Sequence, residues 1–230
     1  MTRRTLPSLA LLLALLALAP LSLHADDEHE VQIRALTAEI KATPQNAELY
    51  LERGELYRQT ENYQAALDDY DRAAKLDPAL HILDFLRGRL YLETDRPSHA
   101  KAPLDRFLEK HPEHSEARMM RARVLVRLRQ PVAAIADYDV AINTSPQPSP
   151  DLFHERADAI AGLGPKRTLD AIVSLDQGIA RLGPIVSLQM QAIDLELSAR
   201  RFDPALARLE TIASRSARKE YYLLQKGEKA

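Results

Sequence analysis

Apolar and small residues recur along the middle of the chain with the spacing of amphipathic helices. Tyr50, Gly54 and Tyr57 lie at i, i+4 and i+7, which places them on one face of an α-helix. Ala66, Tyr70 and Ala73 form a second such face sixteen residues later. Pro78 follows, and proline stops a helix because it lacks an N–H and clashes with the preceding turn. The pattern predicts two consecutive helices and a stop.

The same pair of helices recurs every 34 residues between residues 47 and 148. The aligned rows are Pro44, Pro78, Pro112 and Pro146; Gly54, Gly88 and Ala122; Ala66, Ala100 and Ala134; Arg53, Arg87 and Arg121; Tyr57, Tyr91 and Leu125; and Tyr70, Leu104 and Tyr138. The small residues allow two antiparallel helices to approach closely, and the larger ones fill the space beside them. One such hairpin cannot bury its apolar face alone, so we expect a stack of repeats.

These rows resemble the tetratricopeptide repeat (TPR) family, whose 34-residue pattern sets a large residue, Leu-Gly, Tyr, Ala, Phe, Ala and Pro at fixed offsets. The first unit matches at Tyr50, Gly54, Tyr57, Ala66, Tyr70, Ala73 and Pro78. The second departs with Asp84 and Phe107, and the third with Arg118. The resemblance implies an all-α fold, a right-handed α-α superhelix or TPR solenoid of about three clear and two degraded helical hairpins with capping helices.

The resemblance also divides the chain into segments. We expect a signal peptide (1–25), an N-terminal capping helix (26–46), three clear repeats (47–80, 81–114 and 115–149), two degraded repeats (150–184 and 185–215), and a C-terminal capping helix and tail (216–230). The first cap resembles the second half of a repeat, with an apolar stripe of Val31, Ile33, Leu36 and Ile40. The fifth repeat rests on Leu188, Ala192, Leu195, Phe202, Ala205, Leu209 and Ile212.

Pro146, Pro148 and Pro150 alternate with polar residues after the third unit. This spacing favours an extended path and opposes helix formation. We expect a stiff turn between repeats, with a hinge between two blocks of repeats as the alternative.

Residues 1–25 have the pattern of a secretory signal. Arg3 and Arg4 precede an apolar run that Pro20 ends, and Ala25 offers a cleavage position. The run is shorter than an ordinary membrane span, so we expect export followed by cleavage and a periplasmic or secreted mature chain without a stable membrane span. The paired arginines leave a twin-arginine signal as a less favoured alternative.

Composition excludes several other classes of protein. The chain has no cysteine, so it forms no disulfide, carries no lipidated cysteine and has no thiol nucleophile. It holds 31 basic and 33 acidic side chains, for a net charge of -2. That balance argues against general nucleic-acid binding, which requires a basic face.

Two short segments contain residues typical of chemical sites. The loop from Gly162 to Thr168 contains Gly, Lys and Thr, yet it lacks the spacing of a phosphate-binding loop and is better explained as a loosened turn between helices. His111 and His114 flank a terminating proline without further ligands nearby, so we interpret them as surface histidines. We expect no catalytic group, no metal and no cofactor, and therefore no enzyme.

An arginine row runs through the repeats beside the small residues. Asp69 and Asp137 fall sixteen residues after Arg53 and Arg121, on the facing helix. We expect internal ion pairs, with ligand binding by the arginines as the alternative; burial offsets part of the attraction in such pairs.

The resemblance further implies a concave groove lined by the first helix of each repeat. Carried over to this chain, the groove positions are Leu51, Glu55, Phe85, Arg89, Leu92, Met119, Arg123, Val126, His154 and Asp158. An apolar floor with the guanidinium groups of Arg89 and Arg123 suits a protein partner that presents an extended peptide or helix with apolar side chains and one carboxylate.

The resemblance thus favours a non-enzymatic scaffold or adaptor of the bacterial envelope. Three alternatives stay open. Some of the apolar groove residues pack on the next repeat instead, the chain self-associates through its degraded repeats, or it has a small-ligand or hydrolase accessory role.

Overall fold

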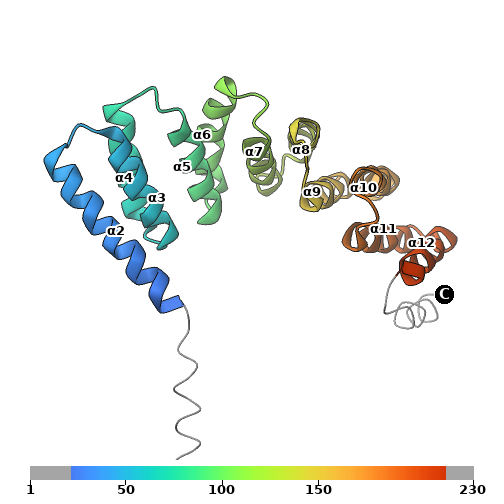
Figure 1. Cartoon of the computed structure of the whole chain (residues 1–230). Coiled ribbons are helices and arrows are strands. Elements are labelled where there is room, and N and C mark those ends of the chain that lie inside the picture. Colours follow the sequence, from blue (N-terminus) through green and yellow to red (C-terminus); the bar gives the residue numbers. More distant parts are fainter. Residues whose placement is uncertain (1–21, 216–230) are drawn as a thin grey trace, which may run out of the picture. The chain divides into compact units, whose positions relative to one another are not determined.

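The computed structural model describes residues 22–215, and within them all regular structure is helical (Figure 1). The helices are α2 (Ser22–Ala42), α3 (Ala47–Gln59), α4 (Tyr63–Leu76), α5 (Ile82–Glu93), α6 (Pro97–Lys110), α7 (Ser115–Arg127), α8 (Pro131–Thr144), α9 (Pro150–Ala161), the 3₁₀ turn η1 (Pro165–Arg167), α10 (Thr168–Leu182), α11 (Val186–Ser198) and α12 (Phe202–Arg215). The all-α prediction is confirmed. None of the helices in this range is long and apolar enough to cross a membrane.

The chain forms two compact units, which divide in the sequence between Leu83 and Asp84. In the first unit, α3 and α4 form a hairpin. Asn46 caps the start of α3 and Asn62 caps the start of α4, and each side chain accepts a hydrogen bond from a backbone N–H of the first turn that follows. Tyr70 is fully buried in this hairpin. A Cβ added to Gly54 would lie 2.7 Å from the Tyr70 ring, so any other residue here would require the ring to move.

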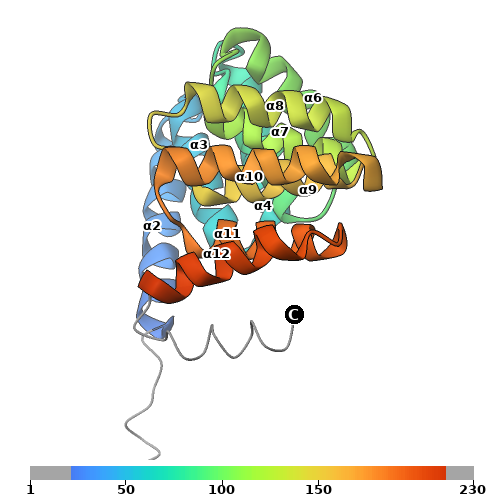
Figure 2. The same cartoon turned by 90° about the vertical axis from the view of Figure 1, so that its right-hand side faces the viewer.

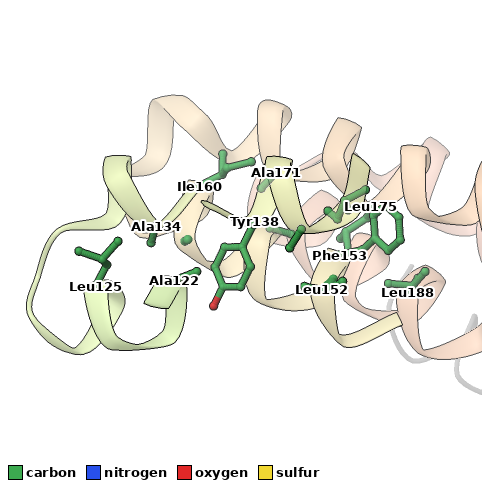
Figure 3. Close-up of a cluster of buried hydrophobic side chains, with 14 of the residues drawn as sticks. Ala122, Leu125, Ala134, Tyr138, Leu152, Phe153, Ile160, Ala171, Leu175 and Leu188 are labelled. Atoms are coloured by element: carbon green, nitrogen blue, oxygen red, sulfur yellow. The ribbon is translucent and has the colours of Figure 1, made fainter. Parts of the chain in front are cut away.

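The second unit continues the same architecture, and the pairs α9–α10 and α11–α12 lie side by side (Figure 2). One core of this unit, called its main core below, runs from Ala122 on α7 to Ala192 on α11 and includes the side chains of Tyr138, Phe153 and Leu175 (Figure 3). Further along the chain, Ile193, Ala205, Leu209 and Ile212 form a second cluster between α11 and α12.

The proline run after α8 is a short inter-repeat connection. The prolines prevent a helix only as far as Ser149, because Pro150 is itself the first residue of α9. At that position the backbone N–H would have no partner within the helix, so proline loses no hydrogen bond there. The main core of the second unit has members on both sides of the run, from Ile142 to Leu152. This continuity is that of an ordinary turn between stacked repeats.

Three details of the predicted helices differ in the structure. Helix α2 begins at Ser22, before the expected start of the first cap. Val31 is 61% exposed, since the packed stripe of α2 passes through the half-buried Ile33 and Leu36 and the buried Ile40 instead. Phe202 is 49% exposed because it is the first residue of α12 and precedes the buried face that starts at Ala205. The predicted leader up to residue 21 and the closing helix after residue 215 lie outside the described residues.

Candidate functional site

The arginine row forms the predicted internal ion pairs. Arg53 donates to both oxygens of Asp69, at 2.8 and 2.7 Å, and Arg121 donates to both oxygens of Asp137, at 2.6 and 2.7 Å. Asp69 and Asp137 are 5% and 3% exposed. Each pair joins the first helix of a repeat to the second, so the prediction is confirmed for these two repeats.

Each of these arginines also reaches back to the preceding repeat. Arg53 donates from Nη1 to the Thr37 hydroxyl on α2 at 3.0 Å, and Arg121 donates from Nη1 to Asp105 on α6 at 2.9 Å. Each guanidinium group therefore links the first helix of its repeat to the second helix of the same repeat and to the second helix of the preceding one. These arginines stabilise the stack, and their donors are directed inward rather than towards a ligand.

The row varies where the sequence varies. Pro103 replaces the facing aspartate in the second repeat, and Nη1 of Arg87 lies 3.8 Å from Asp84 on its own helix. In the fourth repeat, Arg156 donates from Nε to the Ser174 hydroxyl at 2.8 Å. Arg156 also donates from Nη1 to Asp139 on α8 at 2.8 Å, so the row keeps its structural role in this degraded repeat through a neutral hydroxyl on the facing helix and an ion pair to the preceding one.

A cavity of about 530 Å³ opens on the second unit between α7, the start of α8 and α9, and we call it the α7–α9 cavity. Its lining residues are Arg123, Val126, Arg127, Arg129, Pro131, Tyr138, Glu155, Asp158, Ala159 and Gly162. Three predicted groove residues are among them: Arg123, Val126 and Asp158. The structure thus brings these three positions together around one hollow of ligand size.

Arg123 is already paired inside this cavity. Its Nε and Nη2 donate to the Glu155 carboxylate at 2.9 and 2.7 Å, and the Tyr138 hydroxyl donates to the same carboxylate at 2.9 Å. Figure 3 shows the Tyr138 hydroxyl pointing out of the apolar cluster that encloses the ring. Burial, together with the nearby negative charge of Glu155, raises the pKa of Tyr138 far above its ordinary value. Arg123 is therefore not the open carboxylate receptor that we predicted.

His154 and Asp158 connect two first helices. The His154 ring nitrogens lie 2.5 Å from the Gln191 amide oxygen and 3.0 Å from the Ser187 hydroxyl, both on α11. Gln191 also donates to Asp158 at 2.6 Å. Burial raises the pKa of the Asp158 carboxyl, while the hydrogen bond from Gln191 acts in the opposite direction. These two predicted groove residues bridge repeats four and five.

Phe85 does not form a groove floor as predicted. It is 5% exposed, and its ring centroid lies 5.3 Å from those of both Phe107 and His114. The cause is Phe107, which stands where the first and third repeats have an alanine. Its larger ring draws Phe85 and His114 into an aromatic cluster.

The remaining predicted positions of the second unit are only half-buried: Arg89, Leu92 and Met119. Arg89 lies over the Phe85 ring, with its Cζ 5.8 Å from the centroid, and Met119 packs against the main core. The Leu92 carbonyl accepts a hydrogen bond from Arg127 at 3.1 Å. None of these three lines the α7–α9 cavity.

Leu51 and Glu55 line a different cavity, of about 460 Å³, in the first unit. We call it the α2–α3 cavity; its other lining residues are Gln32, Ala35, Leu36, Glu52 and Leu56. The Glu55 carboxylate accepts a hydrogen bond from the Tyr70 hydroxyl and lies 3.5 Å from Arg58 Nε. Five of the predicted site residues thus line two cavities in separate units, and the other five line neither of these two cavities.

Sequence reasoning missed the residues at the edge of the α7–α9 cavity. Arg129 is exposed with φ at 60°, and it makes no hydrogen bond or ion pair with the residues described. Arg127 makes an exposed ion pair with Asp95 at 3.3 Å. Arg129 does align with Glu61 and Asp95 at the 34-residue period, and both also have positive φ. The period therefore predicts a turn at Arg129, but it does not indicate that the Arg129 side chain lines a cavity.

The two weaker chemical candidates are parts of helix ends. His114 caps α7, because its Nδ1 accepts a hydrogen bond from the Ala117 N–H at 3.2 Å, and His111 stacks on Phe107 at 4.6 Å. The loop after Gly162 is a turn that leads through η1 into α10, with Gly164 at φ 120°. Among residues 22–215, no three His, Asp or Glu side chains gather where they could hold a metal ion.

Comparison with known proteins agrees with this architecture. Two family models described as tetratricopeptide repeats match residues 47–80 and 85–150. The chain is a tetratricopeptide repeat protein. The resemblance noted in the sequence is therefore confirmed, while export and a bacterial source stay predictions.

Among curated proteins, the Protein SGT1 homolog of Oryza sativa subsp. japonica is 38% identical over 56 residues, which are 24% of this chain and 15% of that protein. The chain thus matches only a small part of that relative. The solved structure of YrrB, described as a TPR protein with an unusual peptide-binding site, superposes with a TM-score of 0.65 at 19% identity, over 84% of this chain and 98% of YrrB.

The structure of PilW, described as a widely conserved type IV pilus biogenesis factor, gives a TM-score of 0.58 at 17% identity, over 74% of this chain and 77% of PilW. At such identities both likenesses show the fold alone. That fold is the TPR solenoid, a scaffold for protein interactions.

Proposed function

We propose that this chain is a non-enzymatic scaffold of the bacterial envelope that holds a segment of a partner protein in the α7–α9 cavity. The observation that carries the proposal is the cavity itself: about 530 Å³, with apolar surface beside an exposed arginine that has no partner among the described residues. Cavities of this size and mixed lining accept a few side chains of a bound segment.

The chemistry of the cavity defines the segment. Val126, Pro131 and Ala159 offer apolar surface for an aliphatic or aromatic side chain. Arg129 is available to a carboxylate, and Arg127 joins it readily because its pair with Asp95 is exposed and therefore weak. Arg123 holds the wall through Glu155 instead of binding the ligand. The partner therefore presents an apolar side chain and a carboxylate, as the sequence indicated, but the arginines of the α7–α8 turn receive the carboxylate.

The envelope location rests on the signal-like residues 1–25. Two proteins of the same fold add support by analogy, since one is described as peptide-binding and the other as a factor in pilus biogenesis. An exported chain without cysteine keeps its stability in the envelope because stacked repeats supply a continuous core without disulfides.

Arg129→Glu tests the proposal, with Arg200→Glu as the matched control. Both arginines are exposed, and both occupy the turn between the two helices of a repeat, with φ of 60° and 57°. After crosslinking in the native envelope, we expect the chief partner adduct to be lost from Arg129→Glu and retained by Arg200→Glu. Equal recovery of that adduct from both variants would exclude the α7–α9 cavity as the binding site.

A further inference from the structure

Helix α2 is the second half of a repeat. Thr37 on α2 accepts a hydrogen bond from Arg53, just as Asp105 on the second helix α6 accepts one from Arg121. The two acceptors are separated by two periods of 34 residues. Within residues 22–215, no first helix precedes α2.

One face of α2 is consequently less covered than the same face of the other second helices. Leu36 belongs to the row of Tyr70, Leu104 and Tyr138, which are 0%, 0% and 1% exposed against the first helix of their own repeat. Leu36 itself is only half-buried. Gln32 is exposed, although its row consists of the fully buried Ala66, Ala100 and Ala134.

The α2–α3 cavity lies along this face. Gln32, Ala35 and Leu36 form the wall on α2, and Leu51 and Leu56 belong to the wall on α3. In the second unit, the first helix α9 contacts its own second helix, α10, and the next first helix, α11. A first helix for the half-repeat would in the same way contact α2 and α3, which are the two walls of this cavity.

The edges of the cavity are acidic. Glu28 and Glu39 share the face of α2 that carries Gln32, while Glu52 lines the cavity on α3 and Glu48 lies one turn before it. All four are exposed, and their carboxylates make no hydrogen bond or ion pair with the residues described. Arg58, one turn beyond Glu55 on the same face, is already beside that carboxylate at 3.5 Å.

We propose that the α2–α3 cavity binds a cationic amphipathic helix of a partner protein, which completes the half-repeat. The occupant is a helix because the two walls correspond to α10 and α11, which the first helix α9 contacts in the second unit. It carries Lys or Arg beside its apolar face because Glu52 lines the cavity and Glu28, Glu39 and Glu48 lie within one or two turns of its lining residues on the same two helices. A second copy of this chain pairing through the same face would bring two sets of carboxylates together, and like charges oppose that contact.

A first helix of this chain supplies the probe. The peptide of residues 115–127 contains Arg118, Arg121, Arg123 and Arg127 with a single acid, Glu116. With a fluorescent label it is titrated with the full chain, and its anisotropy reports binding. We expect the double variant Glu48→Lys with Glu52→Lys to weaken binding by about tenfold or more, because two attractive contacts become repulsive.

The double variant Glu109→Lys with Glu113→Lys is the control, since it changes the net charge equally through exposed residues of the second unit. A second variant, Gln32→Trp, places a ring in the cavity without adding charge and should abolish peptide binding while the helical circular dichroism stays intact. Equal weakening by the two double variants, or full binding by Gln32→Trp, would overturn the proposal. The proposal would also be overturned if sedimentation equilibrium showed that the unmodified chain is a dimer and that Gln32→Trp dissociates it.

This site is independent of the α7–α9 cavity. Arg129→Glu should leave the affinity for the cationic peptide unchanged, and a loss of affinity in that variant would contradict the assignment to α2 and α3.

Discussion

At the scale of single residues, Asp137 links more groups than any neighbouring carboxylate of the third repeat. It is 3% exposed and accepts hydrogen bonds from Arg121 and, at 2.7 Å, from Arg118. Removing one partner of a buried ion pair leaves the other charge without compensation, and that loss exceeds the small net value of an intact pair.

Asp137→Ala should therefore lower the free energy of unfolding by about 3 kcal/mol. Asp170→Ala, which removes the exposed partner of Arg167, should change it by less than about 1 kcal/mol. Urea denaturation followed by circular dichroism measures both. A cost for Asp137→Ala as small as that for Asp170→Ala would show that the arginine row does not hold the repeats together.

Gly88 sets two effects of substitution against each other. Alanine has the higher helix propensity, worth about 1 kcal/mol in a helix interior. However, a Cβ at this position would lie 2.5 Å from Leu104 Cγ, and Leu104 is fully buried. Overpacking a core usually costs about 1–3 kcal/mol, so steric conflict outweighs propensity.

We expect Gly88→Ala to destabilise the protein and to lower its melting temperature in calorimetry. Ala122, which occupies the same row in the third repeat, shows that the architecture itself accepts a Cβ where the facing side chains leave room. A higher melting temperature for Gly88→Ala would show that Leu104 moves aside at little cost.

At the scale of helices, periodicity predicted the elements well because the rows are contacts. Small residues, tyrosines and arginines repeat every 34 residues since each position meets the same neighbour in every repeat. The contacts between successive first helices do not follow that period. Arg123 meets Glu155 32 residues later, and His154 meets Gln191 37 residues later, so no row indicated either contact.

Phe85 illustrates the other limit of the pattern. Its row position indicated a groove residue, yet the ring lies in the core because Phe107 replaces a small residue on the facing helix. A single large side chain on α6 is thus accompanied by one further buried residue on α5, while the rest of the buried face matches that of α7. The spacing of apolar residues within α5 does not indicate that Phe85 is buried, because the cause lies on α6.

The bridge between α9 and α11 makes stability depend on pH through Asp158. Its pKa in the folded chain is raised, so the folded state holds a proton that the unfolded state has already released, and the contribution of Asp158 to stability falls as pH rises through this interval. Asp158→Asn removes the charge and keeps an oxygen that can accept from Gln191.

Relative to the unmodified chain, Asp158→Asn should gain stability as pH rises from below the ordinary aspartate pKa to neutrality, and the gain should then level off. Urea denaturation at a series of pH values gives this difference. A difference independent of pH, or one that grows towards acid, would contradict the raised pKa.

At the scale of the whole molecule, the chain carries two cavities of opposite charge, one in each compact unit. Glu52 and Glu55 line the α2–α3 cavity, and Arg127 and Arg129 lie at the edge of the α7–α9 cavity. An adaptor needs separate surfaces of different specificity, and opposite charges provide that difference because each repels the ligand of the other.

Site-specific photocrosslinking tests the central claim, that the α7–α9 cavity holds a partner segment. A photoreactive residue replaces Val126, which lines the cavity and is 39% exposed, or Val132 on α8, which lies outside the lining and is 70% exposed. In cells that contain the native envelope, we expect one dominant protein adduct from position 126 and none from position 132. No adduct at 126, or the same adducts from both positions, would contradict it.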